Sequence, residues 1–86
     1  MFGYLLLMKI IISESQQASI IRNYLEPYEE SGCVKIKTTS KYMVVDVESA
    51  SYFKDMGFEE RDCSMIKKFL IKNGFIYSFG DYIKEL

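Results

Sequence analysis

The chain has 86 residues, of which 49% are hydrophobic and 27% are charged, and its formal net charge is −1. This composition lies outside the disordered range and predicts one small globular domain over residues 1–86. The chain lacks the basic excess of a typical duplex-binding protein, and it has no histidine, the commonest general base and metal ligand.

The two cysteines, Cys33 and Cys63, fall in different predicted elements. Such a pair predicts reduced thiols in a cytoplasmic protein rather than a disulfide framework. Two cysteines without histidine cannot supply the four ligands of a structural zinc site or form a Cys–His dyad. We therefore expect no metal and no other cofactor.

The first predicted element is the apolar run 4–12, which contains a single charge, Lys9. The run is less than half as long as the roughly 20 residues that a membrane-spanning helix needs. A charge inside the run also does not suit a signal peptide. A short apolar run of this kind predicts a central β-strand that is buried on both faces.

A helix is predicted directly after this strand. The segment 13–16, Ser-Glu-Ser-Gln, has the spacing of a capping box at a helix start. Ile21 and Leu25 then lie on one helical face. We expect Pro27 to end the helix, because proline lacks an amide hydrogen and disfavours helical geometry at the residue before it.

Residues 33–47 alternate between two sets of side chains and predict a β-hairpin with its tip at residues 39–40. In the predicted register Ile36 faces Met43, and apolar side chains face each other along one side of the hairpin.

The remaining residues predict two helices and one or two strands. Ser49 is a suitable N-cap for the first of these helices, and Gly57 is a suitable left-handed terminator. The expected elements are a helix at 50–56, a helix at 59–72 that ends at Asn73-Gly74, a strand at 75–79, and a strand or tail at 82–86 that follows a tight turn.

The resulting order is βαββαβ, with the second helical region split in two. This order predicts a single two-layer α+β domain of the ferredoxin-like type, in which the first and third strands are central neighbours and both helical regions cover one face. A C-terminal hairpin after residue 79 would be an addition to that fold. As an alternative, residues 49–86 follow the order helix, turn, helix and hairpin, which resembles a winged helix.

Catalytic chemistry has little support in the sequence. Glu14, Asp46 and Glu48 lie at predicted strand ends, where Mg²⁺-dependent nucleases keep their ligands. In the predicted sheet, however, the first and third strands run antiparallel, so that Glu14 lies far from Glu48. Because no base is available to activate a hydroxyl group either, we expect a protein that is not an enzyme.

Nucleic-acid binding is the alternative function. Basic residues interleaved with an aromatic ring suit single-stranded RNA, although Asp46 and Glu48 on the same face would repel phosphates. The candidate residues on the open side of the predicted sheet are Lys9, Lys35, Lys37, Lys41 and Tyr42. In the winged-helix version, duplex DNA would meet Arg61, Ser64, Lys67, Lys68 and Lys72.

Protein binding is the function that the sequence favours. If alternate residues of the first strand point to the helices, then Leu5, Leu7 and Ile11 lie on the open face beside Tyr42 and Val44. An apolar patch of that size needs a cover, either another protein or the tail at 82–86. We therefore expect a non-catalytic interaction module that acts as a homodimer or as an inhibitor or regulator of a larger partner. No membrane partner is expected. The Ile- and Lys-rich composition suggests an AT-rich coding source, such as a phage or another mobile element.

Overall fold

The computed structural model describes residues 14–86. The predicted strand at 4–12 and the predicted capping residue Ser13 lie outside this part of the chain. The described elements are the helix α2 (Glu14–Glu30), the strands β1 (Val34–Thr38) and β2 (Tyr42–Val47), the helices α3 (Ala50–Asp55) and α4 (Glu60–Lys72), and the strands β3 (Ile76–Ser78) and β4 (Asp81–Glu85).

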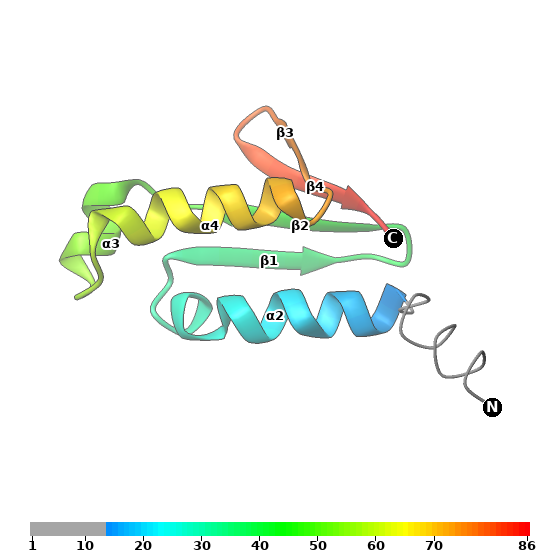
Figure 1. Ribbon diagram of the computed structural model, residues 1–86, viewed down its shortest axis with the longest axis horizontal. Coiled ribbons are helices and arrows are strands. Elements are labelled where there is room, and N and C mark those ends of the chain that lie inside the picture. The colour runs from blue at the N-terminus through cyan, green and yellow to red at the C-terminus, as the bar shows by residue number, and fades with distance from the viewer. Residues whose placement is uncertain (1–13) are drawn as a thin grey trace, which may run out of the picture.

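The four strands form one antiparallel sheet in the order β1-β2-β4-β3. Two hairpins, β1–β2 and β3–β4, are joined by the pairing of β2 with β4. Figure 1 shows α2 running alongside β1 and the β3–β4 hairpin projecting beyond α4. The described chain is therefore an α+β domain with three helices and a four-stranded sheet.

One face of the sheet and the three helices enclose a single core. Leu25 of α2, Phe53 of α3 and Leu70 of α4 are fully buried, together with Met43 and Val45 of β2. Full burial of one such side chain contributes about 1.5–3 kcal/mol. Because side chains alternate along a strand, the residues between Met43 and Val45 and their neighbours on the other strands point to the opposite face.

The predicted ferredoxin-like βαββαβ order is wrong, because the described elements follow the order αββααββ. In the predicted fold the first strand lies beside the third, but in the structure β4 takes this place beside β2. The cause is a tight turn at Phe79 and Gly80, whose φ angles of 49° and 90° return the chain along β3. The tail at 82–86 thus extends the sheet and does not cover its open face, whereas the expected C-terminal hairpin is present.

The β1–β2 hairpin forms as predicted, but its register is displaced by two residues. Ile36 pairs with Val45 rather than with Met43. The turn is wider than expected because the Thr39 hydroxyl accepts hydrogen bonds from the amides of Lys41 (3.2 Å) and Tyr42 (2.9 Å). A displacement by two residues keeps every side chain on its predicted face.

The predicted end of the first helix at Pro27 is also wrong, because α2 continues to Glu30 with Pro27 inside it. The residue after the proline accounts for this continuation. The Tyr28 ring packs against Phe53 and Phe58, with ring centroids 5.7 and 4.8 Å apart. This aromatic packing holds the last turn of α2 against α3, and it outweighs the local cost of the proline.

The two later helices agree with the prediction. The Ser49 hydroxyl accepts a hydrogen bond from the Tyr52 amide at the start of α3, and Gly57 turns the chain after it with a φ of 92°. Glu59 and Asp62 form a capping box at the start of α4 that the sequence reasoning did not anticipate. Within residues 14–86, no helix is both long and apolar enough to cross a membrane.

Candidate interaction surfaces

The sheet face that is turned away from the core is called the open face here. The three described helices contribute their buried side chains to the other face. From the strand register, the open face consists of Lys35, Lys37, Tyr42, Val44, Asp46, Ile76, Ser78, Asp81, Ile83 and Glu85.

A row of apolar side chains crosses the middle of the open face. Val44 pairs with Ile83, and Ile83 pairs with Ile76, so that the row spans three adjacent strands. Ile76 is 70% exposed, and Tyr42, which lies diagonally from Ile83, is 45% exposed. Lys37 continues the row at β1. Val44 and Ile83 are half-buried. A contiguous apolar row that reaches the surface in this way is typical of an interaction surface.

Charges of both signs surround the apolar row. Lys35 pairs with Asp46 across β1 and β2, and the register places Asp81 of β4 next to Asp46. A hollow of about 190 Å³ is lined by Lys35, Lys37, Val44, Asp46 and Asp81. The open face is therefore basic at β1 and acidic along β4.

The predicted interface residues can be compared with this surface. Tyr42 and Val44 lie together on the open face, whereas Leu5, Leu7, Ile11 and also Lys9 are outside the described residues.

Ile76 and Ile83 complete the apolar row, and sequence reasoning missed both of them. The signal that could have found them is the alternation along the last hairpin, which becomes informative once β4 is paired with β2.

The predicted RNA-binding residues do not form a uniformly basic surface. Lys35, Lys37 and Tyr42 share the open face with three carboxylates, and Lys41 lies in the exposed turn between β1 and β2. The carboxylates oppose the approach of a polyanion.

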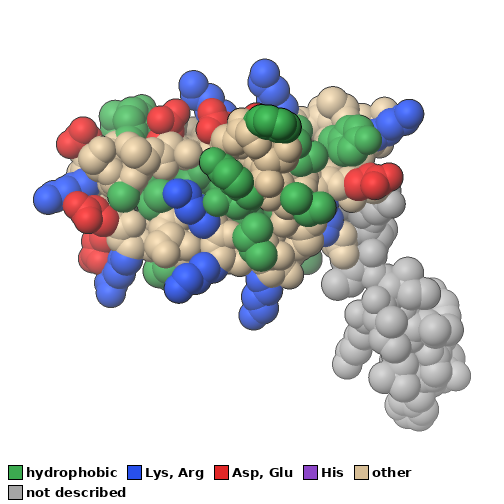
Figure 2. Space-filling view, turned by 90° about the horizontal axis from the view of Figure 1, so that it is seen from above, with side chains coloured by type: hydrophobic (Ala, Val, Ile, Leu, Met, Phe, Trp, Pro, Cys, Tyr) green, Lys and Arg blue, Asp and Glu red, His purple; other side chains and the backbone are tan. Residues whose placement is uncertain are grey.

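A second exposed surface lies on α4. Lys67, Lys68 and Lys72 are exposed, and with Ile71 they line an apolar trough. Ile71 is 53% exposed. Figure 2 views the molecule from the side on which the β3–β4 hairpin projects, and on this side hydrophobic side chains gather in the middle with Lys and Arg side chains around them. Arg61, also on α4, forms an exposed ion pair with Glu59.

The hairpin tip carries the most exposed aromatic ring among the described residues. Phe79 is 103% exposed relative to the reference state and has a φ of 49°. Together with Gly80 it forms a two-residue turn between the paired residues Ser78 and Asp81. Asn-Gly is the usual sequence of a turn in which both residues have positive φ, so that sequence reasoning had no reason to place a phenylalanine there.

The two cysteines of the chain are buried in the core. Burial raises the pKa of the Cys33 thiol, and the nearby carboxylate of Glu48 raises this pKa further. The Cys63 thiol donates to the Glu48 carbonyl oxygen at 3.4 Å, and both cysteines are free. Within the described part of the chain, no group of three His, Cys, Asp or Glu side chains could hold a metal ion.

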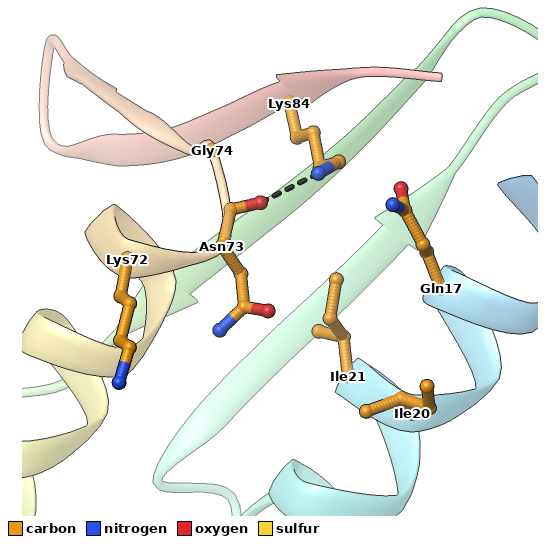
Figure 3. A pocket seen from close by; sticks show the side chains of 7 residues that line it. All are labelled: Gln17, Ile20, Ile21, Lys72, Asn73, Gly74 and Lys84. Atoms are coloured by element: carbon orange, nitrogen blue, oxygen red, sulfur yellow. Dashed lines mark hydrogen bonds between the residues drawn. The ribbon is translucent and has the colours of Figure 1, made fainter. Parts of the chain in front are cut away.

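A pocket of about 400 Å³ lies between the start of α2, the end of α4 and β4. Figure 3 shows the side chains that line it. Lys84 projects from β4 toward Asn73, Ile20 and Ile21 lie on the α2 side, and Lys72 at the end of α4 points away from Lys84. The Lys84 ammonium group donates a hydrogen bond of 2.5 Å to the Asn73 carbonyl oxygen. The pocket is on the helical side of the sheet and is separate from the open face.

Comparison with known proteins does not identify the chain: no protein-family model, no curated protein and no solved structure matches it.

Proposed function

We propose that the protein is a non-catalytic protein-interaction module that forms a homodimer through the open face. The observation that carries this proposal is the apolar row of Val44, Ile83 and Ile76 on a sheet face that lacks a covering helix among residues 14–86. Burial of such a row is favourable by about 25 cal/mol per Å². A domain of this size gains a useful share of its stability from that burial.

The charge pattern of the open face supports a second copy as the partner. Strands lie about 4.8 Å apart, and alternate residues along a strand lie about 6.8 Å apart. The centre of the face lies midway between Val44 and Ile83. Lys37 is therefore about 7 Å from this centre across the strands, and the midpoint of Asp46 and Asp81 is about 7 Å from it along the strands. In an orthogonal packing of two sheets, Lys37 of one copy faces Asp46 and Asp81 of the other.

The test is the oligomeric state of an Ile76→Glu variant. Ile76 is mostly exposed, so the substitution removes apolar contact area from the interface at little cost to the fold. We expect the wild type to be a dimer by multi-angle light scattering. The dissociation constant of the variant dimer should be at least about tenfold higher than that of the wild type. Met65→Glu on α4, where Met65 is 52% exposed, is the matched control and should remain dimeric.

A monomeric wild type at high concentration would rule out the homodimer. If that monomer instead captured a larger protein through the same face, it would act as an inhibitor or regulator of that protein. A cytoplasmic location is part of the proposal and is supported by the two free, buried cysteines.

DNA binding by residues 49–86 is the second candidate function. It is supported by the exposed Lys67, Lys68 and Lys72 on α4 and by the hairpin that projects beside this helix, in the winged-helix-like order of α3, α4, β3 and β4. Lysines on an exposed helix can neutralise DNA phosphates.

Titration with duplex DNA at several salt concentrations tests this second function. If α4 binds DNA, affinity falls steeply with salt, and Lys68→Glu weakens binding by about tenfold or more at low salt. Lys54→Glu on α3 is a control with the same change of charge and should have a smaller effect. Equal effects of the two substitutions would indicate only a general influence of net charge.

A further inference from the structure

Lys84 occupies an unusual position in the sheet. Its cross-strand partner on β2 is Met43, which is fully buried, and Tyr82 and Leu86 flank it on the core-facing side of β4. The alternation of the strand would place an apolar side chain here. Lys84 instead brings a half-buried ammonium group to the pocket between α2 and α4.

The charge of the pocket is not balanced by the described residues that line it. Lys72 and Lys84 are both cationic, and none of the lining residues within 14–86 is acidic. Among residues 14–86, neither lysine forms an ion pair with a carboxylate. An ammonium group has three N–H donors, and the Asn73 carbonyl oxygen accepts one from Lys84. This contact caps the last turn of α4 and leaves donors for a ligand.

The opposite wall of the pocket is apolar. Ile21 is almost fully buried and forms part of the core, whereas Ile20 is 53% exposed at the rim. Gln17 stands one helical turn before Ile21 and points toward Lys84 across the opening in Figure 3. A volume of about 400 Å³ is within the range of small-molecule sites.

We infer that this pocket binds a small amphipathic anion, namely a carboxylate or phosphate that carries a short apolar chain. The anionic group accepts hydrogen bonds from Lys84, the positive charge of Lys72 lies at the rim, and the chain lies against Ile20 and Ile21. This binding does not depend on the open face, because the pocket is on the helical side of the sheet.

Three kinds of probe separate the contributions of the anionic group and of the apolar chain. We expect octanoate or octyl phosphate, titrated into the isotope-labelled full chain, to shift the amide resonances of Asn73 and Gly74 in a saturable way. Acetate and inorganic phosphate lack the chain, and octanol lacks the charge, so each should bind at least about tenfold more weakly. The two octyl probes show whether a carboxylate or a phosphate is preferred. Equal binding of octanol or of acetate would overturn the inference, as would an absence of binding by both octyl probes.

Substitutions locate the site on the two lysines. Lys84→Met replaces the cation by an apolar side chain of similar length beside Met43, and Lys72→Met changes an exposed residue that the fold tolerates. Lys84→Met should weaken octyl-anion binding about tenfold, which is the loss expected for one charge-assisted hydrogen bond. Lys72→Met should have a smaller effect, because it removes only a charge at the rim. Lys68→Met on the same helix lies outside the pocket and should bind as the wild type does. Wild-type binding by Lys84→Met would contradict the assignment.

Discussion

Phe79 is the residue whose local conformation fits its side chain least well. Bulky residues rarely adopt a positive φ, and its ring is fully exposed to solvent. We expect Phe79→Asn to raise the free energy of unfolding by about 0.5–1 kcal/mol, because asparagine tolerates the left-handed region that this turn requires. Urea unfolding of the two proteins measures the difference.

A second substitution at this position separates conformation from exposed surface. Phe79→Leu keeps the disfavoured positive φ while reducing the aromatic area, so that its stability should stay within about 0.5 kcal/mol of the wild type. If Phe79→Leu were as stabilising as Phe79→Asn, the backbone conformation would not be the cause. A destabilised Phe79→Asn would show that the ring contributes to the fold despite its exposure.

At the scale of single elements, the sequence predicts what local chemistry determines. Ser49 caps α3, and Gly57 and Gly74 have positive φ values directly after α3 and α4, as expected from residue types alone. The buried stripe of α4 also follows from its spacing, because Cys63 and Leu70 lie on one helical face. These signals act within a few residues, so a single sequence contains all of the information.

Elements that depend on distant contacts could not be predicted in the same way. Pro27 is a local stop signal, but Tyr28 packs against two rings from a segment more than twenty residues later. The Thr39 hydroxyl widens the first hairpin turn and shifts the register. Distant contacts also explain why the open face was predicted only in part. Tyr42 and Val44 follow from the alternation of β2 alone, whereas Ile83 lies beside them only because β4 pairs with β2.

In the described molecule, the two faces of the sheet differ in whether helices cover them. Three helices bury one face, and the other face carries an apolar row between charges of opposite sign. The helices and the covered face also create the cationic pocket at Lys84, on the opposite side from the open face. Dimer formation and anion binding can therefore be tested independently in the same protein.

The stability of the whole molecule should fall at alkaline pH. Burial is the main cause that raises the pKa of Tyr28, Cys33 and Tyr82, which belong to different parts of the core. Above the ordinary pKa values of 9.0 for the thiol and 10.0 for the phenols, the unfolded chain releases protons that the folded chain still holds, so that rising pH favours unfolding. We expect the urea midpoint to be unaffected by these groups below about pH 8 and to decrease toward pH 10.5. Tyr82→Phe, which removes one of the groups, should make the decrease smaller. A midpoint that stays constant or rises over this range would contradict the argument.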